Sequence, residues 1–207
     1  MLVGYLGMWP DCMATIAIVI VATILCIILG IPTGILMSRH QRLCKTINPV
    51  LDLMQTIPSF VYLIPIMMLL GIGKVPGLIA ICVYAIPPVI RLTNLGIREV
   101  NADLKEAINA FGATALQRLV KVELPLALPA IFTGINQTIM MALAMVVIAS
   151  MIGVQGLGMP ILLAINGHYL ALGLLNGLAI VVLAIIFDRI SQSYATRLQT
   201  YRKDEAA

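Results

Sequence analysis

The chain has 207 residues, of which 61% are hydrophobic and 11% charged, and its formal net charge is +4. Soluble domains carry roughly 25% charged residues, so this composition excludes an ordinary soluble domain and indicates a polytopic membrane protein. The four cysteines form no obvious disulfide pair and lack metal-ligand spacing, so we interpret them as small apolar side chains.

The first apolar run lies between Asp11 and Arg39 and predicts a membrane span over about 12–37. The run is too long for the apolar region of a cleavable signal peptide. Gly30 and Gly34 stand four residues apart within it, which favours close packing against another helix. A simple filler role in the membrane is the alternative.

Four further apolar runs predict the remaining spans, and three of them contain prolines. These spans cover about 53–72, 75–95, 126–152 and 170–187. Residues 153–169 are apolar but rich in helix breakers, which fits a re-entrant or surface-lying segment better than a crossing. We therefore expect a single all-α transmembrane domain over residues 1–207, with about five transmembrane helices.

The basic residues predict the orientation of these spans. With five crossings, every Lys and Arg except Lys74 falls on the same side of the membrane. The positive-inside rule places that side in the cytoplasm. The N-terminus is then outside, the C-terminus inside, and the loop at 96–125, hereafter the polar segment, is cytoplasmic. The positive net charge thus reflects topology.

The polar segment contains the signals of a short first helix. Asp103 and Glu106 have the spacing of a capping box and predict that a helix begins there. Gly112 can adopt the left-handed conformation that ends a helix. Between these signals lie the apolar residues Ala107, Ile108, Ala110 and Phe111. Such a short helix is marginal alone and needs a surface to pack on. A solvated connector is the plainer alternative.

A second helix is predicted to follow at once. Thr114 and Gln117 repeat the capping-box spacing, and we expect the helix to run to Leu124, where Pro125 ends or kinks it. Acidic and basic residues are equally frequent between positions 98 and 124, so this segment has no net charge with which to neutralise phosphates. This balance excludes DNA as a partner of the two helices.

The polar segment resembles the cytoplasmic "EAA" loop of the integral membrane subunits of bacterial ABC importers. The matching residues are Glu106, Ala107, Gly112, Leu124 and Pro125. Ile108 replaces the second Ala of the motif, and Val122 replaces its Ile. The resemblance implies that this loop binds a cytoplasmic ABC ATPase, and that all seven positions belong to the coupling site.

Two long stretches carry a wider resemblance: DLMQTIPSFVYLIPIMMLLGIGKVPG at residues 52–77 and GINQTIMMALAMVVIASMIG at residues 134–153. They are similar to the permease subunit of the glycine betaine/proline osmoprotectant importers, and the likeness extends over essentially the whole chain. Longer members of that family carry an additional N-terminal region. The resemblance implies a type I ABC importer permease fold in the bacterial inner membrane. It also implies a homodimer of permeases, an extracytoplasmic substrate-binding protein, and a separate ATPase that holds ATP and magnesium. The sequence contains no G-x-x-x-x-G-K-[ST] motif, so we expect neither enzyme activity nor a cofactor in this chain.

The polar residues of the spans are candidates for a solute path. Thr133, Asn136 and Gln137 share one helical stripe, which either lines the path or forms hydrogen bonds to another helix. Gln55 and Tyr62 are further candidates, and Tyr62 can either bind a quaternary ammonium group or simply pack.

Other classes of protein are less consistent with these residues. No carboxylate lies within a predicted span, which argues against a proton-coupled secondary transporter. The two histidines have no partners for intramembrane catalysis. An ABC permease for another small polar solute remains an alternative to an osmoprotectant permease.

Overall fold

The computed structural model describes residues 7–205, with side chains to residue 193, and every regular element in this part of the chain is helical. The helices are α2 (Trp9–Arg39), α3 (Gln41–Thr56), α4 (Ser59–Leu70), α5 (Lys74–Ala85), α6 (Pro87–Arg98), α7 (Ala102–Ala110), α8 (Ala115–Arg118), η1 (Leu119–Glu123), α9 (Leu124–Ala149), η2 (Ser150–Ile152), α10 (Gly158–Gly167) and α11 (Leu170–Glu205). This architecture confirms the predicted all-α fold.

Four helical stretches are long and apolar enough to span a membrane. They are Trp9–Arg39, Lys74–Arg98, Ala115–Ile152 and Leu170–Ser193. The pair α3 and α4 passes the same test when it is taken together, although its two helices meet at a bend of 100°. The described chain therefore has four or five candidate spans, in agreement with the prediction of about five.

The predicted span over 53–72 is not one continuous helix. Pro58 disfavours helical geometry at the preceding residue, and Ile57 adopts an extended conformation with φ −69° and ψ 127°. Thr56 therefore ends α3, and α4 starts again at Ser59. Helix α3 also begins earlier than the predicted span, at Gln41, so only His40 separates it from α2.

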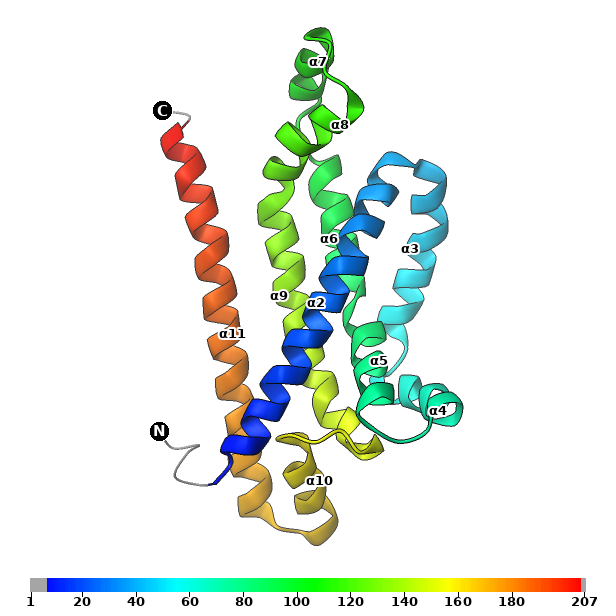
Figure 1. Cartoon of the computed structure of the whole chain (residues 1–207), viewed down its shortest axis with the longest axis vertical. Coiled ribbons are helices and arrows are strands. Elements are labelled where there is room, and N and C mark those ends of the chain that lie inside the picture. Colours follow the sequence, from blue (N-terminus) through cyan, green and yellow to red (C-terminus); the bar gives the residue numbers. More distant parts are fainter. Residues whose placement is uncertain (1–6, 206–207) are drawn as a thin grey trace.

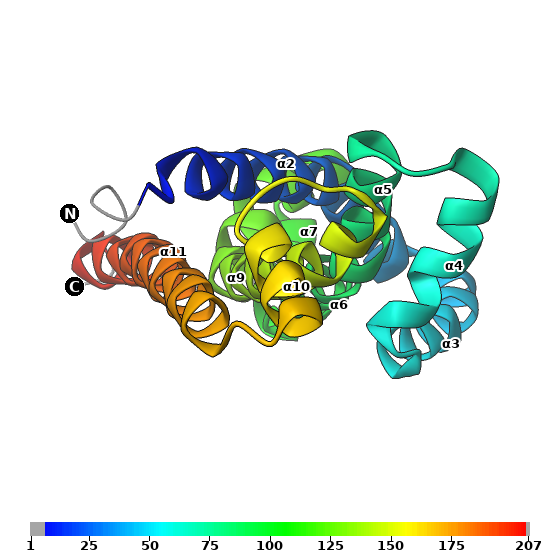
Figure 2. The ribbon, with the colours of Figure 1, turned by 90° about the horizontal axis from the view of Figure 1, so that it is seen from below.

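Helix α9 lies at the centre of the bundle and packs against α2, α5, α6 and α11 (Figure 2). The main core is built from side chains of α2, α5, α6 and α9, among them Val19, Ile81, Val89, Met145 and Val146. These five side chains are fully buried, so none of them contacts the surroundings of the bundle. The bundle is thus held by close packing around one central helix.

Gly30 and Gly34 lie where α2 crosses α6, which favours the packing interpretation over simple filler. A Cβ atom at Gly34 would lie 2.7 Å from both the carbonyl oxygen of Ile90 and the Cβ atom of Thr93. A Cβ atom at Gly30 would lie 2.4 Å from Val89 Cγ1. The missing side chains therefore allow the two helices to approach closely.

We expect Gly34→Ala to destabilise the folded protein by about 2 kcal/mol, because a methyl group would force α2 and α6 apart. The thermal unfolding midpoint of the purified protein measures this effect. Gly177→Ala in α11 is the matched control, since nothing lies within 4 Å of a Cβ atom at that position. Equal midpoints for the two variants would contradict the packing role of Gly34.

The two ends of the bundle are different. Helices α7 and α8 lie at one end, together with the C-terminal part of α11, whereas α10 and the start of α2 lie at the other (Figure 1). Helix α10 has 10 residues and is about 15 Å long, only half the hydrocarbon thickness of a bilayer. Its length fits the prediction of a re-entrant or surface-lying segment.

Candidate functional site

The polar segment projects beyond the ends of the long helices (Figure 1). None of the residues of α7 or α8 is buried. Helix α7 is 9 residues long, so it gains little from its own hydrogen bonds and depends on contacts outside itself for stability. This projecting segment is the first part of the candidate site.

The start of α7 differs from the prediction, whereas its end agrees. The N-cap is Asn101, whose side chain accepts a hydrogen bond from the backbone N–H of Asp103 at 2.9 Å. Asp103 lies in the first turn instead, where its charge interacts favourably with the helix dipole. Gly112 has φ +73°, the left-handed geometry that the sequence predicts at the end of the helix.

The second helix begins as predicted, and of the two predicted outcomes at Pro125, an end or a kink, the structure excludes the end. Thr114 and Gln117 form a complete capping box at the start of α8. Pro125, however, lies in the first turn of α9, and the helical path continues from α8 through η1 into α9. Residues Leu119–Glu123 form a π-helical turn. A wider turn relieves the clash between a proline ring and the preceding backbone, which explains why Pro125 does not end the helix.

The polar segment carries four large apolar side chains that are exposed, which we call the apolar tip. They are Leu104 (45% exposed), Phe111 (91%), Leu116 (68%) and Val120 (54%). The remaining motif positions divide between surface and bundle: Glu106, Ala107 and Gly112 are exposed, whereas Ile108, Val122, Leu124 and Pro125 are partly buried. Large apolar groups exposed together on a projecting element are typical of a binding surface.

Glu123 fastens the polar segment to α2. Its carboxylate is buried and forms ion pairs with Arg118 at 3.1 Å and with Arg39 at 3.7 Å. Arg39 also donates a hydrogen bond from Nη2 to the carbonyl oxygen of Ala115 at 2.8 Å. These contacts link α8 and the turn that follows it directly to the end of α2. The sequence motif did not single out Glu123 or Arg39 for this role.

The predicted polar stripe of α9 faces away from α2. Ile131 and Ile135 belong to a cluster that includes Ile31 and Ile35 of α2, whereas Thr133 and Gln137 are exposed. Residues two positions apart on a helix point about 200° apart, so these two pairs occupy opposite faces. The Thr133 hydroxyl donates a hydrogen bond to the carbonyl oxygen of Pro129 within its own helix, at 2.9 Å.

Asn136 connects α9 to α11 and corrects one sequence expectation. Its Nδ2 atom donates a hydrogen bond to Asp188 Oδ1 at 2.7 Å. Asp188 was predicted to lie beyond the last span, but the candidate span Leu170–Ser193 includes it. Asn136 lies 12 residues after the start of α9, or about 18 Å along the helix. Asp188 thus lies inside a helix that is long and apolar enough to span a membrane, whereas the sequence placed it after the last predicted span.

Gln55 and Tyr62 lie apart from this stripe, on α3 and α4. Gln55 is exposed near the end of α3. The Tyr62 hydroxyl donates a hydrogen bond to the carbonyl oxygen of Met54, and its ring meets Tyr84 edge-on with a centroid distance of 5.9 Å. These contacts fix the bend between α3 and α4, which favours the packing interpretation of Tyr62.

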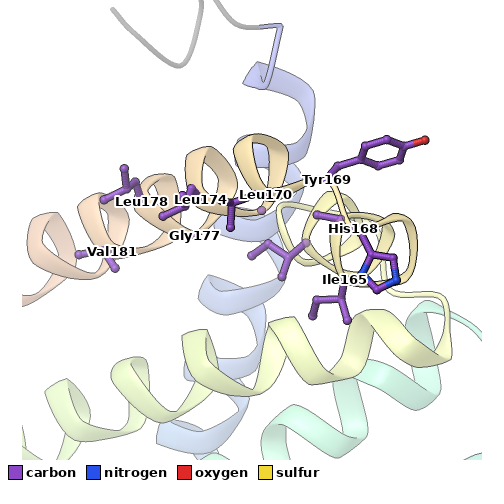
Figure 3. Close-up of a pocket in the computed structure, with 11 residues that line it drawn as sticks. Ile165, His168, Tyr169, Leu170, Leu174, Gly177, Leu178 and Val181 are labelled. Carbon is purple, nitrogen blue, oxygen red and sulfur yellow. The ribbon is translucent and has the colours of Figure 1, made fainter.

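A cavity of about 720 Å³ lies between α10 and α11. Figure 3 shows Leu170, Leu174 and Leu178 along one wall and Ile165 on the other. Among the residues that line this cavity, only His168 and Tyr169 have titratable side chains. Such a surface offers few groups to replace the hydration of a small polar solute, so we do not place the solute path here.

Curated sequences provide close relatives over most of the chain. The permease protein ProW of the glycine betaine/proline betaine transport system of Escherichia coli (strain K12) is 52% identical over 191 residues, which cover 92% of this chain and 54% of that protein. The glycine betaine transport system permease protein OpuAB of Bacillus subtilis (strain 168) is 48% identical over 93% of this chain and 68% of that protein. The chain spans about half the length of its ProW relative.

The fold is also found in a solved structure. A chain of the MetNI methionine ABC transporter in an inward-facing conformation has a TM-score of 0.82 and 20% sequence identity, with 92% of this chain and 95% of that chain covered. This likeness confirms the predicted permease fold. The family model "Binding-protein-dependent transport system inner membrane component" matches residues 27–200. The chain therefore belongs to the family of binding-protein-dependent transport system inner membrane components.

Proposed function

We propose that this chain is the membrane-spanning subunit of an ATP-driven importer in the bacterial inner membrane, and that the importer carries a small osmoprotectant such as glycine betaine or proline. The names of the relatives at 52% and 48% identity support this substrate class. A permease subunit does not hydrolyse ATP, so ATP and magnesium belong to a partner ATPase. A second copy of the chain and an extracytoplasmic substrate-binding protein complete the proposed importer.

The apolar tip is the observation that carries the proposal. Phe111 is 91% exposed at the end of α7, and a soluble partner that covers this ring would remove it from water. The partner we propose is the ATPase, which places the tip in the cytoplasm and the start of α2 outside. The ion pairs of Glu123 then provide a route from the ATPase to α2.

The solute path is proposed for the exposed face of α9. Polar groups exposed to lipid are costly, so Thr133 and Gln137 are better placed toward a second permease or a hydrated path. Asn136 borders a small cavity of about 180 Å³ together with Thr133 and Gln192. Gln55 and Tyr62 are the weaker path candidates, because neither lies on this stripe.

Gly112 provides a test of the coupling assignment. Gly112→Val should reduce uptake by about tenfold, because a β-branched residue at φ +73° costs roughly 1–2 kcal/mol and would redirect the chain between α7 and α8. Gly112→Asn is the matched control, since Asn tolerates this conformation and nothing lies within 4 Å of the added Cβ atom. Uptake of radiolabelled glycine betaine by the complete importer measures the difference. Equal uptake by both variants, with equal membrane insertion, would contradict the assignment.

A proton-coupled secondary transporter is the second candidate, and Asp188 is the observation that favours it. The carboxylate lies in a candidate span and accepts hydrogen bonds from Asn136 and Gln192. Proteoliposomes separate the two candidates. We expect uptake to require internal ATP and to survive a protonophore, whereas uptake that a proton gradient alone supports would favour the secondary transporter.

Competition between glycine betaine, proline and choline tests the proposed substrate class. The complete importer should be measured with its own substrate-binding protein, because the binding protein contributes to solute choice. Inhibition of labelled uptake by one of these compounds supports an osmoprotectant. Uptake that all three leave unchanged would favour another small polar solute.

A further inference from the structure

A second cavity, of about 490 Å³, lies where the polar segment joins the bundle. Its walls come from the ends of α2 and α6, from α7, and from the start of the continuous helix that leads into α9. The residues lining it are Ser38, Arg39, His40, Ile97, Arg98, Lys105, Arg118 and Glu123. Four cationic side chains and one carboxylate therefore line one partly open cavity.

Two of these four cations are oriented by groups that carry no charge. Lys105 Nζ donates a hydrogen bond to the carbonyl oxygen of Ile97 at 3.1 Å, at the end of α6. Arg98 donates from Nη1 to the thiol of Cys44 at 3.3 Å. A carbonyl oxygen or a thiol fixes the direction of a side chain without cancelling its charge.

Glu123 neutralises only part of this charge. Its carboxylate pairs with Arg118 and, at the longer distance of 3.7 Å, with Arg39. Lys105 and Arg98 line the same cavity and form no ion pair with a described residue. The cavity thus holds an excess of positive charge that an anion would stabilise.

A phosphate group suits this excess of positive charge better than a single carboxylate does. It presents several acceptor oxygens around one centre, and guanidinium and ammonium groups are the usual donors to such oxygens. The cavity also lies at the ends of two candidate spans, Trp9–Arg39 and Lys74–Arg98, where a membrane-spanning helix would meet the lipid headgroups. Basic pockets between transmembrane helices at this level bind anionic headgroups.

We propose that this cavity binds a phosphate-bearing anion, and that Lys105, Arg98 and Arg39 hold its oxygens. The anion is either the phosphodiester of an anionic lipid headgroup or a soluble phosphate. In either case it connects α7, through Lys105, to the ends of α6 and α2. An occupied site therefore restrains the polar segment, whatever solute the protein carries.

Binding to the purified protein in nanodiscs tests the proposal. One arm compares phosphatidylglycerol with phosphatidylcholine, and the other adds inorganic phosphate to phosphatidylcholine nanodiscs. The measured quantity is the thermal unfolding midpoint, with retained lipid counted by native mass spectrometry. A rise with phosphatidylglycerol identifies the lipid as the source, and a rise with inorganic phosphate alone identifies the soluble ion.

The double variant Arg98→Gln/Lys105→Gln should bind the stabilising anion about tenfold more weakly, because it loses two charge-assisted contacts. The charge-matched control is Arg42→Gln/Lys121→Gln, which removes two basic residues that do not line the cavity. Lys105→Arg keeps the charge and should retain binding, which separates loss of the site from misfolding. Equal losses in the double variant and its control, or no rise in the midpoint in either arm, would overturn the proposal.

Discussion

Phe111→Ser is expected to abolish ATP-driven uptake while the folded bundle remains intact. The ring is 91% exposed and belongs to the polar segment, so it contributes nothing to the core. If the ATPase covers this ring, its loss should weaken the association by about 2 kcal/mol, or roughly thirtyfold in Kd. Co-purification of the ATPase and uptake by proteoliposomes measure the two effects.

Ile72→Ser is the matched control for this experiment. Ile72 is 73% exposed, and it lies in the turn between α4 and α5, away from α7 and α8. The substitution removes a large exposed apolar side chain at a different place, so ATPase association should be unchanged. If Phe111→Ser binds the ATPase as tightly as the control does, the apolar tip is not the docking surface.

Local signals in the sequence were sufficient to predict much of the polar segment. The capping box of Thr114 and Gln117 and the left-handed Gly112 depend on residues within one or two turns, and the structure contains both. The N-cap of α7 was placed two residues too late because Asn101 and Asp103 are both good capping residues. The choice between them depends on where the preceding helix ends, which is a property of the whole bundle.

Contacts between distant residues could not be predicted in the same way. Asn136 and Asp188 are 52 positions apart, and Arg39 reaches a carbonyl 76 positions away. One signal for Asp188 was nevertheless present. No Gly or Pro occurs between positions 188 and 205, so nothing in the sequence stops α11 at the first charged residue. Polarity alone was a poor indicator of where that helix ends.

The continuation of α8 into α9 has a similar explanation. A proline predicts a helix end because its ring clashes with the preceding turn. The π-helical turn at Leu119–Glu123 removes this conflict, and it also brings Glu123 into the bundle. The π-helical turn therefore has two effects. It lets the helix continue past Pro125, and it positions the Glu123 carboxylate between Arg39 and Arg118.

Glu123→Gln is expected to destabilise the protein by about 3 kcal/mol, near the lower end of the range for breaking a buried ion pair. The side chain of Glu123 is 6% exposed, whereas the side chains of Arg39 and Arg118 are each 28% exposed and can recover part of their hydration. The amide keeps the shape of the side chain but removes its charge. Thermal unfolding of the purified chain measures the loss.

Glu99→Gln makes the same chemical change at an exposed position at the end of α6 and should cost less than about 0.5 kcal/mol. A double-mutant cycle then separates the ion pair from a general effect of charge. If Glu123 acts through Arg39, Arg39→Gln should cost much less in the Glu123→Gln background than alone. Additive losses would instead mean that α2 and the polar segment are held together by the hydrogen bond from Arg39 to Ala115, and not by the carboxylate.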